Sequence, residues 1–327
     1  FTASHFQASE AGMQILQNGG TAIEAMVAAA AAIAVAYPHM NSLGGDGFWL
    51  IHEPGKQPIA INAAGVSAAQ ASSAWYQDRG FAQIPPRGSA AALTVAGTVA
   101  GWQLALEISE KWQHAIGLEN ILHSAIQLAR HGICVTESLA AASRKTVNEL
   151  AHVAGFSERY LPNGEVLKAG AVLRNEPLAD LLQRLSVAGL DDFYRGKTAD
   201  CIATAFKQVG SPLTNSDLAS YHARLMEPLS VTTSKGTFYN LPLPTQGIAS
   251  LLILALFDRC FDASLDETTQ LHLLVEVTKQ AFRVRNAEAQ DASVASKDIG
   301  RWLDESALQK LAAEIDLNRA APWPNPA

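Results

Sequence analysis

The residue types that most often carry chemistry are sparse in this chain, and few of them are spaced for catalysis. None of the nine histidines lies in an HExxH pattern or another spacing typical of metal ligands. His272 and Glu276 are one helical turn apart and form a candidate ligand pair, but no third ligand accompanies them. No GxSxG elbow for a serine nucleophile occurs. We therefore expect no metal and no other cofactor.

Two turns carry the polar residues best suited to bind a ligand. Arg87 lies in a proline-stiffened turn, residues 85–89, and a guanidinium suits planar anions; a solvated loop arginine or a structural ion pair is the alternative. Asn41 and Asp46 belong to a glycine-rich turn, residues 38–47, which could line a site. There the alternative is that the glycines serve only unusual backbone angles. The turn lacks the GxGxxG pattern of a nucleotide cradle.

The elements that must position these turns alternate between helix and strand. Ser9 is expected to cap a first helix ending near Asn18, and Thr21 with Glu24 predicts a capping box for a second, alanine-rich helix. Strands are expected over residues 48–52, 59–62, 93–95 and 231–241, and helices over 97–111, 119–131, 248–257 and 271–285. We predict one continuous α/β domain over residues 1–327, in which residues 320–327 are a proline-rich linker or free end.

Composition excludes several classes of protein. The chain is 48% hydrophobic and 17% charged, which indicates a globular protein with a sizeable core rather than a disordered one. A net charge of −7 without a basic stripe argues against a nucleic-acid partner. Residues 25–37 are apolar but shorter than the roughly 20 residues of a membrane span, so we expect no membrane association.

The three cysteines are scattered, which argues against a disulfide framework. Each is expected to be a buried or half-buried thiol. This usage favours a reducing compartment, and we predict a cytoplasmic location. The periplasm is the alternative, because the chain opens with Phe1 rather than Met and a leader could have been removed.

Five segments, in order along the chain, resemble the γ-glutamyltranspeptidase family. They are residues 8–22, 38–48, 93–102, 213–221 and 241–247. The resemblance implies an N-terminal-nucleophile hydrolase with an αββα sandwich. It also implies a precursor that cuts itself and frees a threonine at the start of a small subunit, where that threonine attacks the substrate amide. The present chain would then be the large subunit, without a catalytic residue of its own, and its sheets would be completed by the small subunit.

One departure from the family bears on the substrate. In γ-glutamyltranspeptidases an arginine of the large subunit grips the substrate α-carboxylate, and Ser73 stands at the matching position here. Serine cannot make a bidentate grip, so Arg87, fourteen residues later, is expected to hold the carboxylate of a shorter acid, with Asn41 lining the site. This departure, with the forms of the 38–41 and 245–247 segments, is similar to the branch that hydrolyses oxamate to oxalate and ammonia in purine breakdown.

Other functions remain open at this stage. A γ-glutamyltransferase or glutathione hydrolase and an acylase relative are enzyme alternatives, and a non-catalytic binding protein that retains the fold is an alternative of another class. The partners expected are the small subunit and a small-molecule amide, and a dimer of such heterodimers is also considered. The sequence does not specify the true substrate or whether an acceptor other than water is used.

Overall fold

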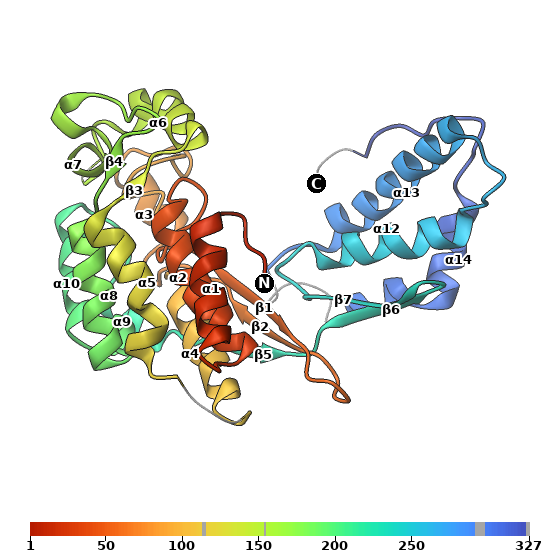
Figure 1. Cartoon of the computed structure of the whole chain (residues 1–327). Helices are drawn as coiled ribbons and strands as arrows, with labels where there is room; N and C mark the ends of the chain where they lie inside the picture. Colours follow the sequence, from red (N-terminus) through yellow and green to blue (C-terminus); the bar gives the residue numbers. More distant parts are fainter. Residues whose placement is uncertain (113–115, 154, 292–297, 325–327) are drawn as a thin grey trace. The chain divides into compact units, whose positions relative to one another are not determined.

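A computed structural model describes residues 1–112, 116–153, 155–291 and 298–324 (Figure 1). The chain divides into two compact units. The first comprises Phe1–Gly47 and Ala63–Arg224, and the second comprises Phe48–Asn62 and Leu225–Ala327. The prediction of a single domain over residues 1–327 stays a prediction.

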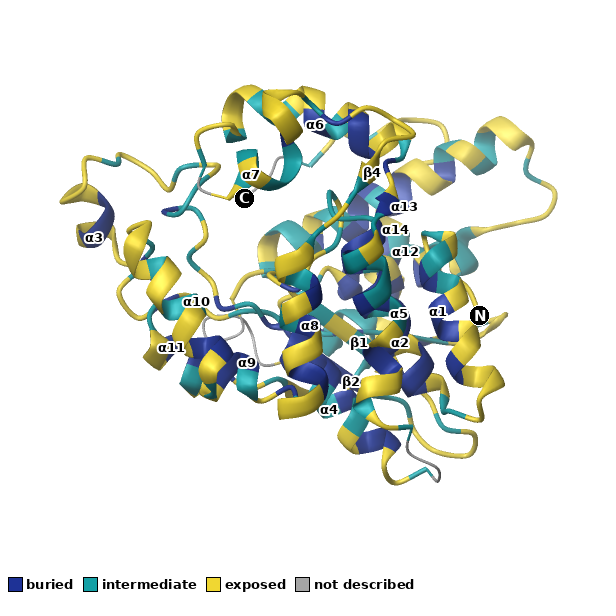
Figure 2. Ribbon diagram, turned by 60° about the vertical axis from the view of Figure 1, so that its left-hand side comes forward, coloured by how far each residue is buried: buried dark blue, intermediate teal, exposed yellow. Residues whose placement is uncertain are grey.

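The first unit is built mainly from helices. Neighbouring pairs among α1 (Phe6–Gln17), α2 (Ala22–Ala36), α5 (Leu118–His131) and α8 (Glu176–Ala188) pack side by side (Figure 1). Figure 2 shows α8 alternating between buried and exposed residues, as an amphipathic helix does. The other elements are α3 (Ser73–Gln77), α4 (Thr98–Ser109), β3 (Ile133–Cys134), α6 (Glu137–Leu150), α7 (Phe156–Tyr160), η1 (Pro162–Gly164), β4 (Val172–Leu173), α9 (Asp192–Arg195), α10 (Lys197–Gln208) and α11 (Asn215–Ser220).

Helix α2 is the central helix of this unit and confirms the expected second, alanine-rich helix. Most of its residues are buried, and α1, α4 and α5 all contact it. Small alanine side chains allow these neighbours to approach closely. The predicted capping box is present, since Thr21 accepts from Glu24 N and Glu24 Oε2 accepts from Thr21 N at 2.7 Å. Glu24 Oε1 also accepts from Ile116 N at 2.8 Å, so this buried carboxylate is satisfied.

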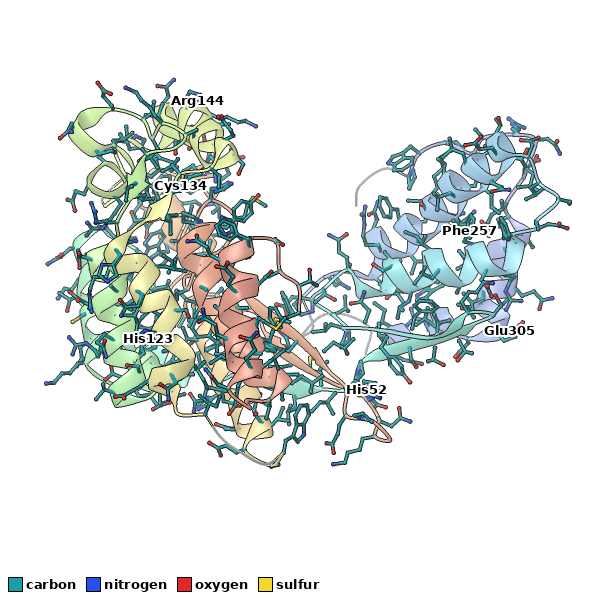
Figure 3. The ribbon with its side chains drawn as sticks, viewed as in Figure 1. His52, His123, Cys134, Arg144, Phe257 and Glu305 are labelled. Carbon is teal, nitrogen blue, oxygen red and sulfur yellow. The ribbon has the colours of Figure 1, made fainter. Side chains whose placement is uncertain are left out.

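The second unit packs helices on an antiparallel hairpin. The hairpin strands β6 (Leu229–Thr233) and β7 (Gly236–Asn240) pair with Leu229 opposite Asn240. The helices are α12 (Gly247–Cys260), α13 (Glu267–Glu288) and α14 (Glu305–Ala313), with a short helical turn, η2 (Ile299–Leu303), before α14. Leu252, Leu256, Leu273 and Val277 are at the centre of the core. At its edge Arg259 of α12 pairs with Glu305 of α14, Nη1 to Oε1 at 2.8 Å; Glu305 is labelled in Figure 3.

A three-stranded sheet has the order β1 (Gly47–Ile51), β2 (Ile59–Ala63) and β5 (Arg224–Met226). The expected strands over residues 48–52 and 59–62 are therefore confirmed. Phe48 and Leu50 alternate along β1 and are 43% and 45% exposed, and Leu225 of β5 is 57% exposed. Alternate residues of a strand share one face of the sheet, so β1 presents an apolar row that the described part of the chain covers only in part.

Three expectations about local elements are wrong. Helix α1 begins at Phe6 with His5 as its N-cap, and Ser9 Oγ instead accepts from Ala3 N at 3.0 Å. Residues 93–95 form only an isolated bridge, Ser67 with Thr94. The expected strand over 231–241 is a hairpin, because the chain turns between Thr233 and Gly236, where Gly236 has a φ of 135°.

Two further expectations concern exposure and the tail. Cys134 (Figure 3) and Cys201 are exposed and Cys260 is half-buried, so the expectation of at least half-buried thiols is wrong for the first two. The tail is not a free end as far as Pro324, because Ala321 is bonded to α13; residues 325–327 lie outside the described residues. No helix within the described ranges is long and apolar enough to cross a membrane.

Candidate active site

The glycine-rich turn after α2 is bonded to the start of α4 in the first unit. Gly45 O accepts hydrogen bonds from Gly97 N and Thr98 N, both at 2.9 Å, and from Thr98 Oγ1 at 2.9 Å. Thr98 Oγ1 is also 2.9 Å from Asp46 O. These hydrogen bonds join the 38–48 and 93–102 segments, two of the segments that resemble the family, across about fifty residues of the chain. We refer to residues 41–47, 63–69 and 95–98 as the junction.

Close backbone approach explains the glycines on one side of the junction. A Cβ on Gly97 would lie 1.9 Å from Ala63 O, and one on Gly65 would lie 1.8 Å from Val95 O. Neither distance is possible for real atoms, so only glycine fits at these two positions.

The glycines of the turn itself have a different environment. Gly44, Gly45 and Gly47 are not among the glycines with positive φ. A Cβ on Gly44 or Gly45 would meet nothing closer than 3.7 Å, and one on Gly47 nothing closer than 3.4 Å. Positive φ angles therefore do not account for these three glycines. At Gly44 and Gly45, where Ser42 Oγ is the single neighbour in range among the described residues, space is open over the turn.

Two tyrosine hydroxyls form hydrogen bonds with backbone groups at the junction. Tyr221 OH donates to Ala64 O at 2.9 Å. Tyr194 OH donates to Ala96 O at 2.7 Å and accepts from Ala100 N at 2.9 Å. Burial, followed by the charge of Asp46, raises the pKa of Tyr221 to about 12, and burial also raises the pKa of Tyr194. Both hydroxyls therefore stay protonated at neutral pH and serve as structural donors.

Two aspartates complete the junction. Asp46 Oδ1 accepts from Gly65 N at 2.8 Å. Asp217, in a capping box with Thr214, accepts from Ala69 N at 2.8 Å. Burial alone would raise the pKa of Asp217, but hydrogen bonds from Thr214 and Ala69 outweigh it and lower that pKa. The 213–221 segment thus becomes the third of the resembling segments to meet at the junction.

Asn41 lies where α2 leads into the junction. Its N–H donates to Tyr37 O at 3.0 Å, and the residue is half-buried. It borders a cavity of about 240 Å³, whose other polar lining residues are Ser42, Tyr160 and Asn175. Its neighbour His39 packs edge-on against Tyr37, with ring centroids 4.3 Å apart. Both ring nitrogens of His39 are buried without a hydrogen-bond partner among the residues that the structure describes, and burial lowers the pKa of His39.

The other two predicted site residues lie on the surface of the first unit. Ser73 is the exposed first residue of α3, and Ser72 Oγ caps that helix by accepting from Trp75 N at 3.2 Å. Arg87 Nε lies 3.2 Å from Glu149 Oε2, and both side chains are about half exposed, at 52% and 56%. Arg87 thus makes the structural ion pair that was its alternative reading. Its role as a carboxylate anchor stays a prediction, as do the roles of Ser73 and Asn41.

A second arginine, close to Ser73 in the chain, was not predicted. Arg79 lies over the Trp75 ring, 4.0 Å from its centroid, and Nη1 donates to Trp75 O at 3.1 Å. The spacing of four residues between an aromatic residue and an arginine was the available signal.

The fifth resembling segment forms a turn in the second unit. Thr245 Oγ1 donates to Leu241 O at 2.9 Å and accepts from Gly247 N at 3.1 Å, where α12 begins. The suspected ligand pair of this unit is engaged elsewhere. His272 Nε2 lies 3.0 Å from Asp316 O, and Glu276 pairs with Lys279. Among the described residues, no three His, Cys, Asp or Glu side chains are grouped to hold a metal.

Two curated proteins are similar to this chain over nearly its whole length, and both are named as hydrolase proenzymes. The chain is 46% identical over 322 residues to an oxamate amidohydrolase proenzyme of Klebsiella pneumoniae, covering 98% of this chain and 61% of that protein. It is 31% identical over 314 residues to a glutathione hydrolase-like proenzyme of Bacillus subtilis, covering 95% of this chain and 59% of that protein. The chain thus spans about three fifths of the length of these relatives.

Solved structures of similar fold agree with the sequence relatives. A γ-glutamyltranspeptidase from Pseudomonas nitroreducens, complexed with L-DON, matches with a TM-score of 0.87 at 26% identity, over 98% of this chain and 96% of that one. The Helicobacter pylori γ-glutamyltranspeptidase matches with a TM-score of 0.90 at 24% identity, over 98% and 93%. These likenesses confirm the predicted N-terminal-nucleophile hydrolase fold. A family model described as gamma-glutamyltranspeptidase matches residues 8–327, and the chain therefore belongs to the γ-glutamyltranspeptidase family.

Proposed function

We propose that this chain is the large subunit of a self-processed amidohydrolase that converts oxamate to oxalate and ammonia. The observation that carries the proposal is the 46% identity to an oxamate amidohydrolase proenzyme over 322 residues. Ser73 supports it, since the arginine expected of a γ-glutamyl-specific site is replaced there. Residues 320–327 then adjoin the cleavage site of the precursor.

The chemistry proposed needs a nucleophile from outside this chain. A threonine at the start of the small subunit adds its hydroxyl oxygen to the amide carbon of oxamate, and ammonia leaves. Water then hydrolyses the oxalyl ester and regenerates the threonine. The open space over Gly44 and Gly45 supports a role for the turn in admitting the partner chain or the substrate, because glycine permits close approach.

The partly covered apolar row on β1 supports the small subunit as partner. Phe48 and Leu50 are 43% and 45% exposed, and adjacent exposed apolar side chains on a sheet mark an interaction surface. The chain expressed alone is therefore expected to aggregate or to melt without cooperativity. A soluble monomer with a sharp thermal transition would contradict the two-subunit proposal.

The experiment that tests the function compares substrates with the purified full-length, processed protein. We expect ammonia release from oxamate and little release from γ-glutamyl anilides. The reverse preference would favour a glutathione hydrolase, the activity named for the 31% identical Pseudomonas aeruginosa relative. Hydrolysis of a third substrate, an N-acyl amide, alone would favour an acylase, the activity named for a relative 28% identical. Inactivity on all three would favour a binding protein.

Processing is tested separately in the precursor. Changing the threonine expected after this chain to alanine should leave one uncut polypeptide, because the hydroxyl that starts the cut is removed. Cleavage at the same place in that variant would mean that an external protease makes the cut.

A further inference from the structure

A buried ion pair on α13 is bonded to the tail of the chain. Lys279 and Glu276 are one helical turn apart, their side chains are 9% and 3% exposed, and Nζ lies 2.7 Å from Glu276 Oε1. Removing two charges from water costs several kcal/mol per ion, and an apolar pair of similar volume is often as stable. Stability alone is therefore a weak reason for an ion pair at this place.

Two further hydrogen bonds of the pair go to one residue of the tail. Lys279 Nζ donates to Ala321 O at 2.6 Å, and Glu276 Oε2 accepts from Ala321 N at 3.2 Å. The ammonium group thus donates to the carbonyl of Ala321, and the carboxylate accepts from the N–H of the same residue. Because each charge matches only one of the two backbone groups, the pair fixes both the position and the direction of the tail, independently of the side chain at position 321.

The residues after Ala321 transmit this position along the tail. Pro322 and Pro324 lock their φ angles and favour extended backbone in the residues before them. Trp323 packs edge-on against Phe282 of α13, with ring centroids 5.8 Å apart. Residues 321–324 also form one wall of a cavity of about 1160 Å³ bounded by α13 and α14. The tail is therefore held at Ala321 and stiff beyond it.

We propose that the Lys279–Glu276 pair is a backbone clamp that positions the cleavage segment of the precursor for self-cleavage. This inference rests on the proposed function, in which residues 320–327 adjoin the cleavage site of the precursor. In the cut, the threonine hydroxyl oxygen adds to the preceding carbonyl carbon, the C–N bond breaks, and the hydroxyl proton goes to the new amine. Water then hydrolyses the ester. A carbonyl misplaced by an ångström loses the geometry for that attack, and both residues act as positioning residues.

The test uses the full-length precursor carrying Glu276→Leu with Lys279→Met. This double variant keeps the volume of the pair and removes both bonds to Ala321. We expect self-cleavage, followed on denaturing gels over time, to slow by at least tenfold. The melting temperature and the turnover per processed molecule should remain close to wild type, which a merely structural role would not predict.

A matched control is Glu165→Leu with Lys168→Met, an exposed pair of the same residue types three apart with Nζ 2.9 Å from Oε2. It should process at the wild-type rate. If the buried double variant does not fold, Ala321→Pro serves instead, since it leaves the ion pair in place and deletes the N–H that Glu276 accepts; it should also slow the cut. Wild-type processing in a folded clamp variant would overturn the clamp. A wild-type precursor that never cuts itself would instead overturn the proposed function.

Discussion

The junction of the first unit and the clamped tail of the second hold irregular backbone in different ways. At the junction, backbone groups bond to one another and glycines are required where chains nearly touch, as at Gly97 and Ala63. At the tail, two buried charged side chains bond to Ala321, whose own side chain takes no part. At the junction a larger residue cannot replace the glycine that makes the close contact. At the tail, Lys279 and Glu276 can be replaced while α13, which carries them, keeps its backbone hydrogen bonds.

The largest effect is expected where the junction allows no atom to be added. Gly97→Ala places a Cβ 1.9 Å from Ala63 O, and the backbone must move to relieve the contact. We expect a loss of about 3 kcal/mol or more in the free energy of unfolding, measured by denaturant titration of the full-length protein.

Gly117→Ala is the control for that measurement. A Cβ at Gly117 meets nothing within 4 Å, and its φ of −58° is open to alanine. The loss there should not exceed about 1 kcal/mol, the value of a helix-cap preference. Equal losses of stability in the two variants would mean that the close contact at Gly97 does not distinguish it from Gly117, which has no such contact.

The exposed Arg87–Glu149 ion pair of the first unit is compared next with the buried Lys279–Glu276 pair of the second. If Arg87 anchors the substrate carboxylate, Arg87→Ala should lower kcat/KM for oxamate by about ten- to several-hundredfold, and Arg87→Lys should recover only part. Steady-state ammonia release by processed enzyme is the measurement.

Glu149→Ala separates the two roles of Arg87. It breaks the same 3.2 Å ion pair and leaves the guanidinium available, so kcat/KM should remain near wild type. Near wild-type activity in Arg87→Ala would reduce that arginine to a surface pair worth at most about 1 kcal/mol of stability.

A smaller effect is expected from removing one hydroxyl beneath the junction. Tyr194→Phe leaves Ala96 O and Ala100 N without the partner they have at 2.7 and 2.9 Å. The expected loss is about 1–3 kcal/mol in the free energy of unfolding. Tyr239→Phe on the half-buried β7 should change stability little. A harmless Tyr194→Phe would mean that the backbone bonds alone hold the junction.

The smallest effect is expected from acid. Because the pKa of Asp217 is lowered from 3.8 in the folded protein, the unfolded chain takes up protons first as the pH falls. The contribution of the Asp217 carboxylate to stability is complete well above pH 3.8. It is lost as the pH falls through the lowered pKa of the folded protein. Melting temperature measured from pH 6 to pH 3 should decline at the acid end, and Asp217→Asn should flatten that decline. An unchanged decline would exclude Asp217 as a source.

Local sequence signals predicted much of the fold. The capping box predicted at Thr21 marks a true helix start, because a cap depends on residues three apart. The strand expected over 93–95 failed because those residues bond to residues 66–68 without a continuous ladder, a contact invisible to periodicity. The hairpin turn at Ser234 and Lys235 was missed because this pair is not the Asn-Gly or Asp-Gly pair that most strongly signals a two-residue hairpin.

What the sequence determined by itself is the family, the order of the resembling segments and the absence of the expected arginine at Ser73. Each depends on residue types along one chain. Tertiary structure alone revealed that residues 38–48, 93–102 and 213–221 meet at the junction, that Arg87 faces Glu149, and that Lys279 and Glu276 bond to Ala321. These contacts join residues from 42 to 148 positions apart, and no local pattern encodes them, because packing of the intervening elements sets which distant groups meet.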